Sequence, residues 1–132
     1  MKKNALKPVL FVVLGLIITT IAFANPFDVP EVTLKGYITD GTNGKVSKVI
    51  LFCEVYKDGG ADVEHYLGEV RDNRSSQWEP HCVQNPEWYN RNKCDLEFHN
   101  LNEGHEYDFR ARAANKAGIG APAALGIMIG IW

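Results

Sequence analysis

The chain has 132 residues and a formal net charge of −2, from 14 Lys and Arg against 16 Asp and Glu. Beyond the first seven residues the basic side chains form no cluster of the kind that binds nucleic acid or anionic lipid, so both partner classes are excluded. The length suits a single domain with one hydrophobic core.

Residues 1–24 have the pattern of a cleavable signal peptide. Three lysines among the first seven residues precede an apolar run at residues 9–21, which ends in the small-x-small sequence Ala22-Phe23-Ala24. Signal peptidase cleaves after this pattern, so we expect a mature bacterial domain of residues 25–132, secreted or periplasmic, with no lipobox cysteine and no membrane span. An uncleaved anchor is the competing interpretation, because the run is near the lower limit for crossing a bilayer. Cleavage makes the formal charge 11 − 16 = −5.

The rest of the chain shows short alternating runs separated by Gly, Asn and Asp, without helical periodicity, which indicates an all-β domain. The first three runs cover residues 32–38, 46–56 and 65–70. Because a strand alternates faces, one set of apolar residues in the second run should point into the core. This set is Val49, Leu51, Cys53 and Val55.

The alternation stops at residues 72–93. Long irregular segments inside compact domains are often functional, and Trp, Tyr and Arg dominate the hot spots of interfaces. Trp and Tyr also suit stacking against sugars. The alternative is structural, with Trp78 in the core of an irregular strand and Trp88 and Tyr89 packed over the sheet. The candidate binding residues are Arg74, Trp78, Trp88, Tyr89 and Arg91.

Three cysteines, Cys53, Cys82 and Cys94, lie beyond the signal sequence. Export to an oxidising compartment predicts one disulfide and one remaining thiol. Cys82 and Cys94 bracket the irregular segment, so we expect this pair to be bonded, which would stabilise the fold by roughly 3 kcal/mol. The alternative pair is Cys53 and Cys94, because Cys94 shares the inward phase of Leu96 and Phe98.

The sequence contains no recognisable catalytic or metal-binding constellation. The four histidines, at positions 65, 81, 99 and 105, have no paired spacing that would build a metal site. Neither G-x-S-x-G nor H-E-x-x-H occurs. We therefore predict no cofactor, no metal and no enzymatic activity.

Two further alternating or apolar runs lie in the last 28 residues. Residues 105–113 show the clearest alternation, with apolar and charged side chains on opposite faces. Residues 125–132 form a final apolar run, which we expect to be the last strand beside residues 107–113. The alternative is an exposed edge that pairs with another subunit, since an unpaired apolar edge templates strand addition.

A more specific pattern covers residues 96–122. Leu101 stands six residues before Tyr107, with Gly104 between them, and the alternation Tyr-x-Phe-x-Ala-x-Ala leads to Asn115-x-x-Gly118-x-Gly-x-Pro. This pattern resembles the E–F–G end of a fibronectin type III domain. The first half of the domain is similar to bacterial Ig-like domains. The buried strand-B Trp of typical fibronectin type III domains has no clear counterpart.

The resemblance implies a two-sheet Ig-like sandwich of about seven strands. In it Leu101 would plug the bottom, Gly104 would permit a tight turn, and the Tyr107 hydroxyl would bond back to upstream backbone as a tyrosine corner. Asn115 and Gly118 would adopt left-handed conformations.

These families imply binding rather than catalysis. We therefore predict an exported, non-enzymatic module of adhesion type that binds a protein or a glycan. The alternative is a structural subunit of a cell-envelope or filament assembly, joined through residues 125–132.

Overall fold

The computed structural model describes residues 26–132, so the expected signal peptide lies outside the described residues. Within the described part the chain is all-β and contains no helix. The strands are β1 (Glu31–Thr42), β2 (Lys45–Lys57), β3 (His65–Asp72), β4 (Glu79–Gln84), β5 (Lys93–Phe98), β6 (Glu106–Asn115), β7 (Gly118–Ile119), β8 (Ala123–Ala124) and β9 (Ile129–Gly130).

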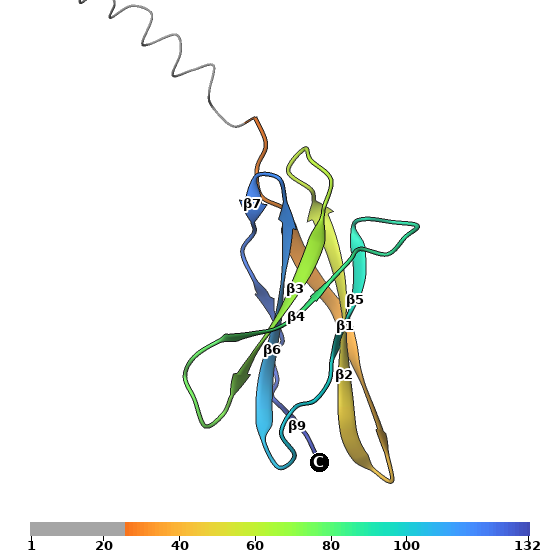
Figure 1. Ribbon diagram of the computed structural model, residues 1–132, viewed down its shortest axis with the longest axis vertical. Helices are drawn as coiled ribbons and strands as arrows, with labels where there is room; N and C mark the ends of the chain where they lie inside the picture. Colours follow the sequence, from red (N-terminus) through yellow and green to blue (C-terminus); the bar gives the residue numbers. More distant parts are fainter. Residues whose placement is uncertain (1–25) are drawn as a thin grey trace, which may run out of the picture.

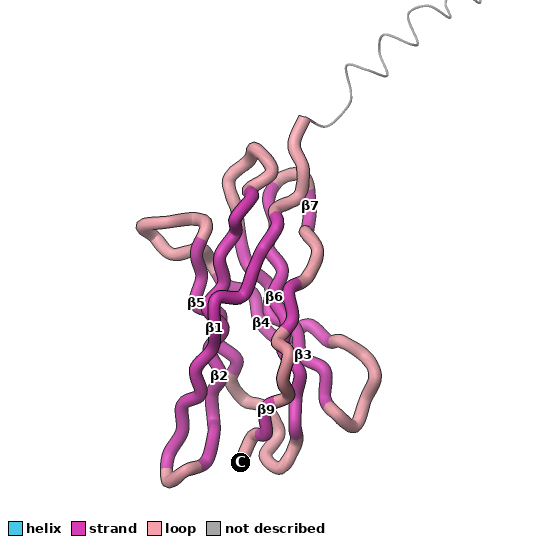
Figure 2. Tube along the Cα trace, turned by 180° about the vertical axis from the view of Figure 1, so that it is seen from behind, coloured by secondary structure: helices cyan, strands magenta, loops and turns pink. Residues whose placement is uncertain are grey.

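The strands form two antiparallel sheets that pack as a sandwich (Figures 1 and 2). One sheet has the order β1-β2-β5 and the other the order β4-β3-β6-β7, with β8 and β9 also paired to β6. The short strands β7, β8 and β9 therefore together occupy the place of one edge strand beside β6. The prediction of an all-β, two-sheet sandwich is confirmed.

The period of two in the sequence decides which residues are buried. In β2 the predicted inward set is buried, and in β5 its partners across the sheet are buried with it, as Leu51 pairs with Leu96. Across the gap, β6 contributes alternate apolar residues from Tyr107 to Ala113. Phe98 and Phe109 join the two layers, edge to face, with ring centres 5.0 Å apart. Such alternation buries one face of each sheet and leaves the other to solvent.

The first hairpin owes its register to a two-residue turn. Thr42 pairs with Lys45, and the two residues between them, Asn43 and Gly44, both have positive φ angles of 56° and 75°. This is the type I′ geometry that matches the right-handed twist of the strands, and Asn-Gly is its preferred sequence. The hairpin extends past the rest of the sandwich at one end (Figure 1).

The loop between β5 and β6 closes that same end of the sandwich. The backbone N–H of Asn102 donates to the hydroxyl of Tyr107 at 3.0 Å, and half-buried Leu101 packs against the core. Gly104 has a φ of 82°, and its N–H donates to the carbonyl of Ile131 at 2.7 Å. These bonds tie the loop to both the strand that follows it and the C-terminal segment.

Asn115 differs from its expected conformation. It is the last residue of β6 and is not among the residues with positive φ, whereas Gly118 has a φ of 137°. The expectation of a left-handed Asn115 is therefore wrong. Its buried amide instead donates to the carbonyls of Asp28 and Asp58, both at 2.8 Å, and accepts the N–H of Ala117. The side chain holds three loops together, which requires an amide rather than a special backbone.

Replacing Tyr107 with Phe should destabilise the domain by about 1 kcal/mol or more, because a half-buried N–H would lose its acceptor. Urea unfolding of the mature chain measures this change. The control is Tyr56→Phe, since the Tyr56 hydroxyl donates to Glu31 on the exposed surface; there we expect less than about 0.5 kcal/mol. Equal effects of the two changes would contradict a structural role for the Tyr107 hydroxyl.

Candidate functional site

The segment that reads as irregular in the sequence contains an edge strand. β4 pairs with β3 and divides the segment into a loop at residues 73–78 and a loop at residues 85–92. Pro80 lies in β4, which fits an edge strand because Pro cannot donate to a second neighbour. The expectation of an unbroken irregular segment is wrong. The five candidate residues consequently fall into two groups on opposite sides of the sandwich (Figures 1 and 2).

Trp78 packs over the outer face of the β3–β6 sheet. The guanidinium groups of Arg71 and Arg110 lie 4.7 Å and 4.4 Å from its ring centre. Both arginines are themselves paired at 2.7 Å, Arg71 with Asp108 and Arg110 with Glu69. These charged side chains face one another across the two strands, where opposite charges stabilise a sheet. The indole is half-buried in this layer, so its role is structural.

Arg74 bonds to the residues just before β6. Its Nη1 donates to Nε2 of His105 at 2.7 Å and its Nη2 donates to the carbonyl of Gly104. The other ring nitrogen of His105 donates to Asp72, which also accepts the backbone N–H of Arg74 at 3.0 Å. The hydrogen bond from the Arg74 N–H, and to a smaller extent the one from His105, holds the pKa of Asp72 below its ordinary value of 3.8. Arg74 therefore fastens the β3–β4 loop to the start of β6.

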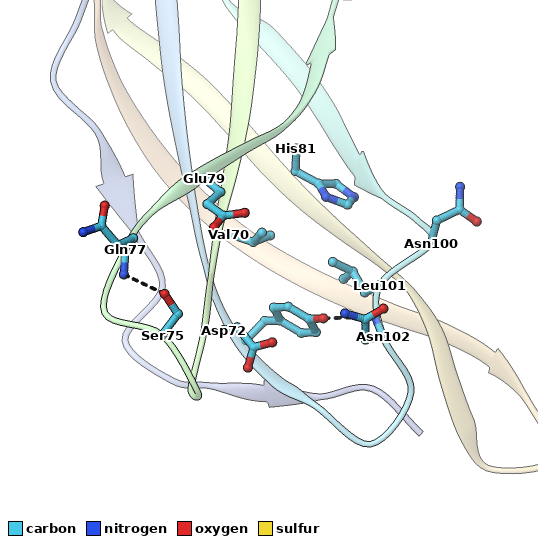
Figure 3. Close-up of a pocket in the computed structure, with 10 residues that line it drawn as sticks. Val70, Asp72, Ser75, Gln77, Glu79, His81, Asn100, Leu101 and Asn102 are labelled. Atoms are coloured by element: carbon cyan, nitrogen blue, oxygen red, sulfur yellow. Dashed lines mark hydrogen bonds between the residues drawn. The ribbon is translucent and has the colours of Figure 1, made fainter.

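A polar cleft of about 280 Å³ lies beside this loop (Figure 3). Two of its polar side chains bond to backbone: Ser75 accepts the N–H of Gln77 at 3.2 Å, and Nε2 of His81 donates to the carbonyl of His99 at 2.7 Å. The His81 ring also stacks on Phe98. These contacts hold the loop in place, and they do not bring a nucleophile to a base.

The second group of candidates forms an exposed aromatic surface. Trp88 is 93% exposed and Tyr89 is 62% exposed, and both stand in the loop of residues 85–92, which we call the tip loop. Their rings meet edge to face with centres 5.5 Å apart and planes at 80°. The interpretation that these two rings pack over the sheet is wrong, because both are largely exposed, and so is the placement of Trp78 in the core, because its ring lies on the outer face against Arg71 and Arg110.

The backbone of the tip loop is closed by its own hydrogen bonds. Glu87 N–H donates to the carbonyl of Lys93 at 2.9 Å, and Lys93 N–H donates to the carbonyl of Asn90 at 3.1 Å. The side chain of Asn90 accepts the N–H of Asn92 at 2.9 Å, an Asx turn that tightens the return to β5. The two aromatic residues therefore stand at the apex of a defined turn.

Bonds to three neighbouring segments fix the loop to the sandwich. The hydroxyl of Tyr66 in β3 donates to the carbonyl of Arg91 at 2.9 Å, and Nη1 of Arg91 donates to the carbonyl of Val63 at 3.1 Å. On the other side, Val55 of β2 donates to the carbonyl of Asn92 at 2.8 Å. The loop is thus anchored to both sheets, and its two aromatic side chains project from a rigid support.

A cleft of about 360 Å³ runs along the tip loop and reaches Glu64, in the segment that leads into β3. Its lining combines one exposed ring with charged and amide groups. Of these residues, the sequence predicts only Trp88 and Arg91 as binding candidates. The lining residues are Glu64, Asn85, Pro86, Glu87, Trp88 and Arg91.

All three cysteines are free thiols in this structure, with Cys53 and Cys94 in the core and Cys82 half-buried against it. Cys53 lies opposite Cys94 on the β2–β5 pair, and Cys82 lies opposite Gly68 on the β3–β4 pair. Burial raises the pKa of the Cys53 thiol far above its usual value, that of Cys82 to about 11 and that of Cys94 to about 12. At neutral pH they are therefore protonated and poor nucleophiles. The bond between Cys82 and Cys94 stays a prediction.

No group of three or more His, Cys, Asp or Glu side chains within residues 26–132 is placed to hold a metal ion. In the same part of the chain there is no helix long and apolar enough to cross a membrane.

No protein-family model matches the chain. Among solved structures, the twitchin kinase region from C. elegans matches 79% of this chain, with a TM-score of 0.60 and 25% sequence identity. Titin domains A168–A170 match 82%, with a TM-score of 0.56 and 21% identity. This chain has an immunoglobulin/fibronectin-like fold. The Ig/fibronectin-like chain spans only 17% and 33% of those two chains, and the matched region is not the kinase.

Loops at the ends of an Ig/fibronectin-like sandwich are common places for binding residues, because the sheets provide a rigid support and the loops are free of core packing. The tip loop joins β4 of one sheet to β5 of the other. The tip loop therefore lies where binding residues are common in this fold, and its Trp and Tyr are exposed. In the β3–β4 loop, by contrast, Trp78 and Arg74 make contacts within the domain.

Replacing Trp78 with Ala should lower the free energy of unfolding by about 1–3 kcal/mol, since two arginines lose the ring on which they pack. Trp88→Ala is the matched control and should change it by less than about 0.5 kcal/mol, because the side chain is exposed. Urea unfolding of both variants measures the two values. A larger loss for Trp88→Ala would show that the roles of the two indoles are reversed.

The contribution of Asp72 to stability should depend on pH in the acid range. Because its folded pKa is lowered, the stabilisation is complete above its unfolded value of about 4 and is lost as the pH falls through the lower folded value. The difference in unfolding free energy between wild type and Asp72→Asn should therefore shrink from pH 6 to pH 2. A difference that stays constant over that range would contradict the assignment.

Proposed function

We propose that this chain is an exported, non-enzymatic binding module of adhesion type, which holds its partner through the tip loop. The observation that carries the proposal is the 93% exposure of Trp88 on a loop that is hydrogen-bonded through its backbone to β2 and β3 and through the Arg91 side chain to the segment between them. A large exposed indole contributes little to the fold, so its presence on a hydrogen-bonded support favours a role in recognition.

The physical advantage of this arrangement lies in entropy. Trp and Tyr bring a large contact area with few rotatable bonds, and they are enriched among the residues that dominate binding energy. A loop that is already ordered loses little conformational freedom when the partner binds. The bonds of Arg91 and Asn92 to neighbouring segments therefore raise the affinity that Trp88 and Tyr89 can supply.

Export and the absence of catalysis are parts of the same proposal. The pattern of residues 1–24 supports secretion into a bacterial periplasm or beyond, and the acidic charge of the mature domain disfavours nucleic acid and anionic lipid as partners. Within residues 26–132, the raised pKa values of Cys82 and Cys94 and the bond of the Ser75 hydroxyl to the N–H of Gln77 support a role without catalysis.

The C-terminal edge favours a second candidate function, that of a structural subunit in an envelope or filament assembly. Between the two-residue strands β8 and β9, Ile127 and Met128 are exposed, and Trp132 is 51% exposed just beyond β9. Exposed apolar groups beside a discontinuous edge strand are suited to pairing with a second chain.

One comparison tests the two functions together. Labelled mature protein is titrated onto intact cells and isolated envelopes of the organism that produces it, using wild type, Trp88→Ala and Trp132→Ala. We expect Trp88→Ala to weaken binding at least tenfold, about 1.4 kcal/mol, with unchanged melting, and Trp132→Ala to bind normally. Normal binding by Trp88→Ala would overturn the recognition role. Loss of concentration-dependent association by Trp132→Ala in sizing chromatography would instead favour the assembly.

A further inference from the structure

We infer that the tip loop takes a neutral glycan, with one sugar ring stacked on Trp88 and its hydroxyls bonded to the side chains that line the adjoining cleft. The inference rests on the proposed function, because it names the ligand class of the same site. Its support comes from the geometry of the two rings, the mixture of donors and acceptors, the balance of charges and the size of the cleft.

The Trp88 ring offers the surface that a sugar ring needs. Its contact with Tyr89 is edge to face at 80°, and 93% of the residue is exposed, so a broad aromatic face remains open. An aromatic face carries partial negative charge and attracts the weakly positive C–H groups that a pyranose presents on its flatter side. Because Tyr89 stands nearly perpendicular and is also exposed, it can contact the next sugar of a chain.

The cleft beside Trp88 supplies both kinds of hydrogen-bonding group. The carboxylates of Glu64 and Glu87 accept, and the amide of Asn85 both donates and accepts. Arg91 has five N–H donors, of which Nη1 already serves the carbonyl of Val63. Sugar hydroxyls donate and accept at once, so this lining can satisfy several hydroxyls of one ring.

The charges in the lining disfavour an anionic ligand most strongly, because two carboxylates stand against one guanidinium, and Arg91 opposes a cation that lies beside it. Glu64 and Glu87 would repel the carboxylates or sulfates of an acidic glycan, while Arg91 would repel a protonated amine placed in the same cleft. An ionic ligand would also place its charge close to at least one like charge of the lining. Such repulsion is a common way to exclude the wrong ligand. A neutral polyhydroxyl ligand meets no such penalty.

The dimensions favour a glycan over a protein partner. The cleft of about 360 Å³ lies near the lower end of the range of about 300–1,000 Å³ for small-ligand sites, which suits one or two sugar rings. A stable protein interface needs about 800 Å² of surface on each partner. The exposed apolar surface at the tip is confined to two adjacent residues, Trp88 and Tyr89.

The test compares neutral sugars with charged ones in two sets, one cationic and one anionic. Isothermal titration of the mature protein compares a neutral N-acetylglucosamine hexamer with its deacetylated cationic counterpart, and a set of neutral hexoses with an anionic oligogalacturonate. We expect a neutral oligosaccharide to bind at least tenfold more tightly than either charged one. We expect Trp88→Ala to lose at least tenfold in affinity, with Trp88→Phe intermediate and Trp132→Ala unchanged.

Treatments of the envelope surface separate a failure of this inference from a failure of the proposed function. Periodate cleaves sugar rings that carry two adjacent free hydroxyls, glycosidases remove sugars that resist it, and protease destroys proteins. Trp88-dependent binding that survives both carbohydrate treatments and is abolished by protease would overturn the glycan and leave the recognition role intact. Tighter binding of a charged oligosaccharide would overturn the neutral ligand class. If Trp88→Ala binds envelopes like wild type, both ideas are wrong; loss of binding after periodate alone supports the glycan.

Discussion

The ring of Phe98 leaves one sheet and lies against Gly68 and Phe109 of the other, and the spacing of the sandwich depends on this contact. A Cβ at Gly68 would come within 2.6 Å of the Phe98 ring and 2.5 Å of the Cys82 sulfur, so a side chain there would force the layers to shift. Gly68 lies in β3, between β4 and β6. The close approach therefore determines where β4 sits, and with β4 the two loops that flank it.

The tip loop inherits its rigidity from that spacing because it runs from one sheet to the other. Its anchors are drawn from both layers, with Tyr66 in β3 on one side and Val55 in β2 on the other. A change in sheet separation would break one set of bonds or the other. The exposed position of Trp88 thus depends on the packing of both sheets, although the residue itself contributes almost nothing to the core.

The sequence predicts the frame better than the site because the frame obeys a period of two. The buried faces of β2 and β6 follow directly from that alternation, and the two-sheet sandwich is implied by the resemblance of residues 96–122 to a fibronectin type III domain. β4 escapes detection because an edge strand needs only one partner and tolerates Pro80. The position of Trp78 on the outer face of the sheet depends on Arg110, which lies 32 residues beyond Trp78 in the sequence. No local pattern could have placed that arginine under Trp78.

The position of the tip loop relative to the C-terminal edge has a consequence for avidity. The two lie toward opposite ends of the sandwich in both views (Figures 1 and 2), so neither would block the other. Chains that paired through β9 would carry their aromatic tips side by side on one array. Contacts that are weak singly would then act at a high effective concentration along a repeating polymer, and the strength of attachment would be set by how many tips engage at once.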